Sequence, residues 1–173
     1  MSEEIQQLKE ILSFPKEVVI IAHRNPDGDA IGSSWGLAGY LSKLQHSVKV
    51  IFPSEYPSSF GFIHGIRQSI VFDLDQNAAR QAIDKAEVIF CLDFNGLDRV
   101  DKLGENIQFS KAKKVLIDHH LDPEPFTDIE FSETDASSTC ELVFKVIDQL
   151  GDRNKITPEI GECLFTGLIT DTG

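Results

Sequence analysis

Short apolar runs alternate along the chain with longer segments in which apolar residues recur every three or four positions. Val18-Val19-Ile20-Ile21-Ala22 and Val88-Ile89-Phe90-Cys91-Leu92 are apolar throughout. Such runs are typical of strands that are covered on both faces. The strands predicted in this way span residues 17–22, 48–52, 88–92, 114–117 and, as a short strand, 129–131.

The intervening segments have the spacing of helices. Ile5, Leu8 and Ile11 repeat at helical intervals, and Ser138 before Thr139 is a typical helix cap. The predicted helices span residues 3–13, 28–45, 78–86 and 139–150, with short pieces at 97–103 and 105–111 and a last helix that starts at 157–159. Alternating strands and helices predict an α/β fold with a mostly parallel central sheet and helices on both faces. In such folds ligands bind beyond the carboxyl ends of the strands.

Composition narrows the class of protein. The 173 residues, 41% of them hydrophobic, are enough for one well-buried domain over residues 1–173. No apolar stretch approaches the roughly 18 residues of a membrane span. Residues 1–4 carry acids where a secretory signal carries bases, which predicts a cytoplasmic protein. Cys91, Cys140 and Cys163 lie in apolar contexts and are expected to be reduced and buried.

The net charge of −12 argues against a broad electrostatic surface for long nucleic acid, so long duplex DNA is not an expected partner. A short RNA or a nucleotide phosphate is still compatible with this charge, because bound divalent cations reverse its local sign.

Acidic and histidine residues follow four of the apolar runs. Leu168-Ile169-Thr170 is interpreted here as a fourth strand-like run, which ends in Asp171. Because parallel strands end at one edge of the sheet, four such loops predict a single metal site. Phosphate-ester cleavage by paired cations needs a crevice rich in oxygen and nitrogen ligands of this kind. The candidate residues are His23, Asp27 and Asp29 in the first loop, Asp93 in the second, Asp118, His119 and His120 in the third, and Asp171 in the fourth.

Each loop also has a simpler explanation. Asp27 and Asp29 repel one another unless a cation or a strong donor lies between them, but alone they fit a solvated turn capped by Asp29. Asp93 and Asp171 alone fit residues that end turns. The four loops together favour the metal site.

The adjacent histidines leave the backbone in different directions, so they are expected to have different roles. One of the pair His119 and His120 would coordinate a metal, and the other would contact substrate phosphate. Asp118 would hold an imidazole N–H and fix the tautomer of a ligand. The alternative is a half-buried structural pair of histidines.

Taken in order, these motifs resemble the DHH phosphoesterase superfamily over nearly the whole chain. Within it the chain is most similar to the branch of bifunctional oligoribonucleases and 3'-phosphoadenosine 5'-phosphate (pAp) phosphatases, the nanoRNases. Ser137-Ser138-Thr139 before a helix is also similar to that branch. The motifs are His23 to Ser33 (HRNPDGDAIGS), Asp93, Asp118-His119-His120 and Gly167 to Gly173 (GLITDTG).

The resemblance implies a site for two divalent ions, usually Mn²⁺, with Mg²⁺ or Co²⁺ as substitutes; mixed imidazole and carboxylate ligands suit Mn²⁺. It implies that His120 contacts the scissile phosphate and that Asp118 orients a ligand. Two such ions acidify a shared water for attack on phosphorus, so no serine or cysteine nucleophile is needed. Arg24 and Arg99, the basic residues nearest the motifs, are the expected substrate contacts. The implied ligands are His23, Asp27 and Asp93 for one ion, and Asp29, Asp93, His119 and Asp171 for the other.

Members of this superfamily usually continue into a second, substrate-gripping domain, and they often form homodimers. We expect the chain to be a catalytic domain truncated at its C-terminal end, with that second domain absent. Hydrolysis by these 173 residues alone is then expected to be weak, while metal binding survives.

Three functions are compatible with the sequence. The first is a manganese phosphoesterase acting on very short RNA and pAp. The second is another hydrolase of the superfamily, cleaving polyphosphate or pyrophosphate, cyclic dinucleotides or single-stranded DNA ends. The third is a non-catalytic module that binds nucleotides or metal.

Overall fold

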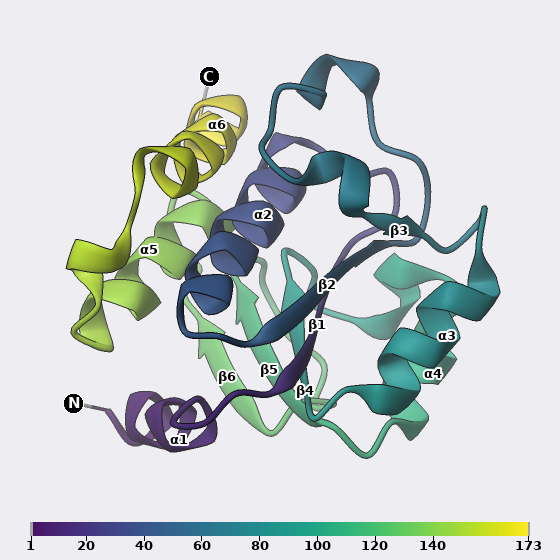
Figure 1. The fold of residues 1–173 in the computed structure, drawn as a ribbon, viewed down its shortest axis with the longest axis horizontal. Helices are drawn as coiled ribbons and strands as arrows, with labels where there is room; N and C mark the ends of the chain where they lie inside the picture. Colours follow the sequence, from purple (N-terminus) through teal and green to yellow (C-terminus); the bar gives the residue numbers. More distant parts are fainter. Residues whose placement is uncertain (1, 173) are drawn as a thin grey trace.

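A six-stranded parallel sheet lies between two layers of helices (Figure 1). The computed structural model describes residues 2–172, so Met1 and Gly173, the ends of the N-terminal acidic segment and of the fourth motif, lie outside it. The strands are β1 (Glu17–Ala22), β2 (Ser47–Phe52), β3 (Ile70–Val71), β4 (Val88–Leu92), β5 (Lys113–Asp118) and β6 (Ile129–Ser132).

The strand order is β3-β2-β1-β4-β5-β6, and every neighbouring pair is parallel. The chain winds outward from β1 to β3 in one direction and from β4 to β6 in the other. The point where the winding reverses lies between β1 and β4. At such a point the loops that follow the two strands separate and leave a crevice.

Helices cover both faces of the sheet, as the sequence predicted. Successive side chains of β1 point to opposite faces of the sheet. Val18 and Ile20 lie in one hydrophobic core, while Val19 and Ile21 lie in the other. Helices α1, α2, α5 and α6 pack in the first core, and α3 and α4 in the second (Figure 1). Their bounds are α1 (Glu3–Ile11), α2 (Gly28–Lys43), α3 (Gln76–Lys85), α4 (Leu103–Phe109), α5 (Thr139–Gln149) and α6 (Pro158–Thr172).

Four short 3₁₀ turns complete the helical structure of the connecting segments. They are η1 (Ser58–Phe60), η2 (Ile66–Gln68), η3 (Leu97–Val100) and η4 (Arg153–Lys155). Within residues 2–172, none of the helices combines the length and the apolar character needed to cross a bilayer.

Two features differ from the sequence-based expectations. Strand β3 was not predicted, because its two residues are too few to give a periodic pattern. The run Leu168-Ile169-Thr170 is not a strand, since it lies in α6. A run of three residues is too short to distinguish a strand from a turn of helix.

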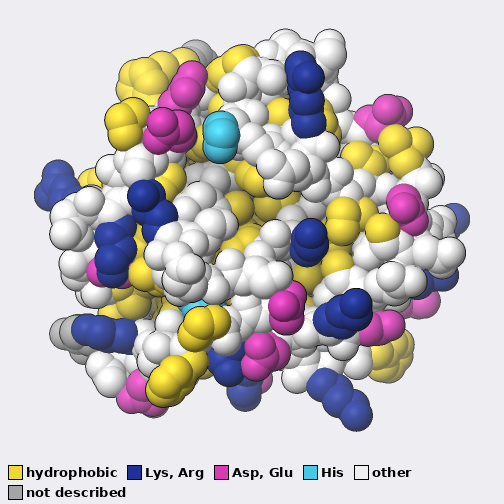
Figure 2. All heavy atoms as spheres, in the orientation of Figure 1, with side chains coloured by type: hydrophobic (Ala, Val, Ile, Leu, Met, Phe, Trp, Pro, Cys, Tyr) yellow, Lys and Arg dark blue, Asp and Glu magenta, His cyan; other side chains and the backbone are white. Residues whose placement is uncertain are grey.

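Charged side chains of both signs are interspersed on the face of the molecule seen in Figure 2. Lys and Arg side chains lie among Asp and Glu side chains there, with apolar groups between them. On this face, neither sign of charge forms a continuous patch.

Candidate metal centre

The six predicted metal ligands lie together beyond the carboxyl ends of β1, β4 and β5, beside the last turns of α6. They fall into overlapping groups whose ligand atoms all lie within 4.8 Å of one another. The groups are His23, Asp27 and Asp93; Asp29, His119 and Asp171; and Asp93, His119 and His120. Asp93 and His119 each belong to two of these groups, and Asp93 is the residue that connects His23 and Asp27 to the two histidines after β5.

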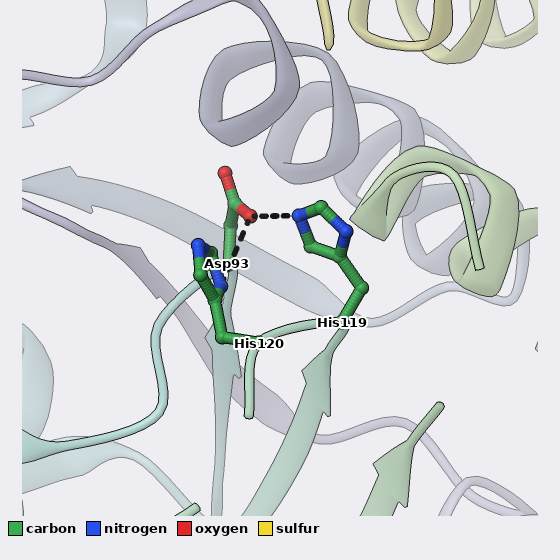
Figure 3. A group of neighbouring side chains, drawn as sticks. All are labelled: Asp93, His119 and His120. Atoms are coloured by element: carbon green, nitrogen blue, oxygen red, sulfur yellow. Dashed lines mark ion pairs between the residues drawn. The ribbon is translucent and has the colours of Figure 1, made fainter. Parts of the chain in front are cut away.

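Asp93 presents a different carboxylate oxygen to each side of the cluster. Its Oδ2 lies 3.4 Å from His23 Nε2, while its Oδ1 lies 3.6 Å from His119 Nε2. The same Oδ1 lies 3.9 Å from His120 Nδ1, and Figure 3 shows both imidazoles directed toward this oxygen. A carboxylate with this arrangement has the geometry needed to bridge two cations.

The backbone of Asp93 has an uncommon conformation. Its φ of +64° lies in the left-handed region, which few residues other than glycine adopt, although Asp and Asn do so more readily than most. The side chain is also buried, with 3% of its surface exposed. Both observations indicate that the fold holds this carboxylate in a defined place, as expected at a functional site.

The first group is built by the tight turn after β1. His23 Nδ1 donates to the carbonyl of Arg24 at 2.8 Å, which leaves Nε2 to face Asp27 Oδ2 at 3.6 Å. The other Asp27 oxygen, Oδ1, accepts from the amides of Asp29 and Ala30, both at 3.0 Å, and caps α2. Each side chain is thus anchored by one atom and presents the other toward the cluster. This capping role belongs to Asp27 and not, as the simpler explanation of the loop assumed, to Asp29.

The second group joins three elements. His119 Nε2 lies 3.8 Å from Asp29 Oδ2 at the start of α2 and 3.7 Å from Asp171 Oδ2. Asp171 was expected in a loop after a strand, but it lies in the last turn of α6. Because α6 packs against α2, Asp171 still reaches His119, as it was expected to do from a loop.

Asp118 pairs with His120. Its Oδ1 lies 2.7 Å from His120 Nδ1, and the carboxylate is completely buried. We expected Asp118 to hold an imidazole N–H and so to orient a ligand. The imidazole that it holds belongs to His120, the histidine predicted to contact phosphate. The buried Asp118 Oδ2 has no hydrogen-bond partner among the described residues.

The charges in the cluster are strongly coupled. Burial and the charge of Asp93 raise the pKa of Asp29 to about 6. Hydrogen bonding to His23 lowers the pKa of Asp27 to about 2. Burial opposes protonation of His23, but hydrogen bonds with Asp27 and Asp93 outweigh it and raise the pKa of His23 to about 10. Carboxylates at this density need positive charge between them, and the set of imidazole nitrogens and carboxylate oxygens suits Mn²⁺.

The two predicted arginine contacts have different surroundings. Arg24 forms ion pairs with Asp73 at 2.6 Å and with Asp101 at 3.4 Å, so its charge is largely neutralised by the protein itself. Arg99 is exposed, its carbonyl accepts from the amide of Arg24, and its charge opposes protonation of His120. Arg99 is therefore near the cluster, and substrate contact by either arginine stays a prediction.

Sequence reasoning missed one residue of the cluster. Thr139 donates its hydroxyl to Asp93 Oδ1 at 3.0 Å and its amide N–H to Asp29 Oδ2 at 2.7 Å. The segment Ser137-Ser138-Thr139 was noticed only as a helix start and as a similarity to one branch of a superfamily. The sequence contains no local signal that its third residue reaches two carboxylates from distant segments.

Comparisons with known proteins agree with this geometry. The sequence profile described as "DHH family, N-terminal domain" matches residues 17–168. The bifunctional oligoribonuclease and PAP phosphatase NrnA of Bacillus subtilis is 27% identical over 171 residues, which cover 96% of this chain and 50% of that protein. The chain spans about half the length of several curated relatives that it matches.

Solved structures give the same picture of the fold. An exopolyphosphatase-related protein from Bacteroides fragilis superposes with a TM-score of 0.97 and 38% identity, over 100% of this chain and 52% of that one. RecJ from Thermus thermophilus in complex with Mn²⁺ superposes with a TM-score of 0.60 over 98% of this chain and 24% of that one. At 15% identity, the RecJ comparison supports the fold alone.

Proposed function

The chain belongs to the DHH family, and from this premise we propose that it is a metal-dependent phosphoesterase that hydrolyses very short oligoribonucleotides and 3'-phosphoadenosine 5'-phosphate. The observation that carries the proposal is the position of Asp93, whose two oxygens face two separate groups of ligands. A phosphoesterase that uses paired cations requires a bridging group of this kind.

The residues fit two divalent ions, with Mn²⁺ as the preferred metal. His23, Asp27 and Asp93 would hold one ion, and Asp29, Asp93, His119 and Asp171 the other. The ligand atoms of the first set lie within 4.8 Å of one another, as do those of Asp29, His119 and Asp171, and Asp93 Oδ1 lies 3.6 Å from His119 Nε2. When bound, such ions supply positive charge to phosphate oxygens and acidify water near neutral pH. A mixture of imidazole and carboxylate ligands favours Mn²⁺, with Mg²⁺ or Co²⁺ as substitutes.

His120 is placed to bind the substrate phosphate. Its Nδ1 is held by Asp118, so its Nε2 remains available to donate a hydrogen bond to a phosphate oxygen. The hydrogen bond with Asp118 outweighs the effect of burial and raises the pKa of His120, which favours the protonated imidazole that binds an anion. The side chain is 38% exposed, compared with 18% for His119, which fits a substrate contact better than a buried ligand.

Two observations support a short substrate. The relative from Bacillus subtilis is named for action on oligoribonucleotides and PAP. The net charge of −12 leaves the metal centre as the main source of positive charge, which suits one or a few phosphates more than a long chain.

A second candidate is hydrolysis at the end of a polyphosphate chain. The Bacteroides fragilis structure, which superposes with a TM-score of 0.97, is described as exopolyphosphatase-related. Either kind of substrate would present its scissile phosphate to the same ligands, so the distinction depends on groups that bind the rest of the substrate.

The test measures Mn²⁺ binding and Mn²⁺-dependent hydrolysis with the same chain. Dinucleotide RNA, pAp, a cyclic dinucleotide and polyphosphate are compared as substrates at equal phosphate concentration. We expect two Mn²⁺ ions per chain and the highest kcat/KM for RNA or pAp. Preference for polyphosphate would favour the second candidate, and absence of both Mn²⁺ binding and hydrolysis would contradict the proposal.

A further inference from the structure

Thr139 connects the two halves of the metal centre. It is the first residue of α5, and it is completely buried. Its hydroxyl donates to Asp93 Oδ1, and the amides of Thr139 and Cys140 donate to Asp29 Oδ2 and Oδ1 at 2.7 and 2.9 Å. The start of α5 therefore holds two carboxylates that repel one another, Asp29 from the first turn of α2 and Asp93 from the loop after β4.

The hydroxyl contact is selective for one oxygen of Asp93. Oδ1 is the oxygen that faces His119, while Oδ2 faces His23. Rotation about the Cβ–Cγ bond of Asp93 would exchange the two oxygens or turn them away from these histidines. This torsion has only a weak preference in an unrestrained aspartate. A hydrogen bond to Oδ1 restrains this rotation. It keeps Oδ1 directed toward His119 and Oδ2 directed toward His23.

We propose that Thr139 is a positioning residue whose hydroxyl orients the Asp93 carboxylate so that it bridges two cations. This inference rests on the proposed two-metal function and deepens it. Thr139 acts through Asp93 and Asp29, and its own oxygen is not assigned as a metal ligand. The backbone donors hold Asp29 whatever the side chain at position 139, so the side chain affects Asp93 specifically.

This separation of backbone and side chain allows a clean comparison. Thr139→Ser keeps the hydroxyl and loses a methyl group, whereas Thr139→Ala loses both. The two variants are similar in size, so they differ mainly in the hydrogen bond to Asp93. Thr166→Val is the control, because it removes a threonine hydroxyl that donates to the carbonyl of Glu162, on the same chain but outside the centre.

The experiment titrates Mn²⁺ into each variant by calorimetry and records the electron paramagnetic resonance spectrum of the loaded protein, with thermal unfolding as a check of folding. In Thr139→Ala we expect the affinity for the second ion to fall about 10- to 100-fold, the range found for residues that orient metal ligands. The spectrum should lose the exchange-coupled signal of a bridged pair. Thr139→Ser and Thr166→Val should retain both the affinity and the coupled signal.

The alternatives give different results. Equal effects of Thr139→Ala and Thr139→Ser, or a coupled pair that persists in Thr139→Ala, would overturn the role of the hydroxyl while leaving the proposed function intact. Failure of the unaltered chain to bind two Mn²⁺ ions would overturn the proposed function itself, and the positioning role with it.

Discussion

Gly167 of α6 lies against the backbone of Asp29 at the start of α2. A methyl group at Gly167 would lie 3.0 Å from both Asp29 Cα and Asp29 Oδ1, and it would overlap the sulfur of Cys140. This close approach brings the end of α6, with Asp171 one turn further on, to the metal centre. The absence of a side chain at one position thus allows a ligand from the C-terminal helix to join those from the sheet.

Gly167→Ala should therefore weaken both the fold and the site. Overlap with Cys140 and Asp29 should cost about 1–3 kcal/mol of unfolding free energy, and displacement of Asp171 should reduce affinity for the second metal ion. Gly161→Ala is the matched control, because nothing lies within 4 Å of the added methyl group on the same helix. It should raise stability, by up to about 1 kcal/mol, through helix propensity. Chemical denaturation and Mn²⁺ titration measure both effects, and equal behaviour of the two variants would contradict the packing argument.

Asp93→Asn should impair both metal positions. Asparagine tolerates the φ of +64°, so the backbone should be retained while the bridging charge is lost. Replacement of a residue that only orients a metal ligand typically lowers metal affinity or activity about 10- to 100-fold. We therefore expect replacement of the bridging ligand to lower kcat/KM by more than about 100-fold. Asp122→Asn is the control, since Asp122 also has a positive φ, of 54°, and loses the same charge. Steady-state hydrolysis of dinucleotide RNA with Mn²⁺ measures the difference.

Asp73→Asn should improve substrate binding. Asp73 neutralises Arg24 through a 2.6 Å ion pair, so its replacement leaves the arginine with only the longer 3.4 Å pair to Asp101 and also removes a negative charge. Exposed pairs are worth up to about 1 kcal/mol, so KM for short RNA should fall by no more than about fivefold, with kcat unchanged.

Asp128→Asn is the control for Asp73→Asn. Asp128 is paired with Lys113 at the beginning of β5, far from the carboxyl ends of the strands, and its replacement changes the net charge equally. An equal fall of KM in both variants would indicate a general charge effect and would exclude a specific role of Arg24.

His46 should make stability depend on pH. It is buried, and its Nδ1 accepts the amide N–H of Lys16 at 3.0 Å, which requires the neutral ring. Burial, with a smaller effect of the Lys16 charge, lowers the pKa of His46 below its usual 6.5, although Glu87 opposes this. The unfolded chain then binds the proton more readily, so stability should decrease as the pH falls below about 6.5.

His46→Asn tests this dependence, because the Asn amide oxygen can accept from Lys16 without titrating. The unfolding temperatures of the two proteins are compared between pH 5 and pH 8. We expect the unaltered chain to lose more stability than His46→Asn on acidification. Parallel curves for the two proteins would exclude His46 as the cause.

Much of the architecture could be predicted from local patterns. The runs at β1 and β4 are apolar at every position because both faces of these strands are covered, and this condition is visible in the sequence. The ends of β1 and β4 are predictable too, since the apolar run stops at His23 in the first and at Asp93 in the second. Parallel strands share one edge, so the loops after β1, β4 and β5 could be brought together before any coordinates were known.

The end of α6 could not be predicted in the same way. Leu168-Ile169-Thr170 was interpreted as a strand because three residues are too few to show a period, whereas in the structure they belong to α6, which packs against α2. The partner of Asp118 was also undetermined, since adjacent imidazoles are equally close in sequence. Thr139 was missed because it bonds to residues 46 and 110 positions away.

The sequence by itself determined the type of fold, the strands that end at the site and the identity of the candidate ligands, because each depends on residues that are close together in the chain. Only the tertiary structure decided which oxygen of Asp93 faces which histidine, how Asp171 reaches the centre and that Thr139 holds it together. These depend on distances between remote segments, and such distances are set by helix packing rather than by local pattern.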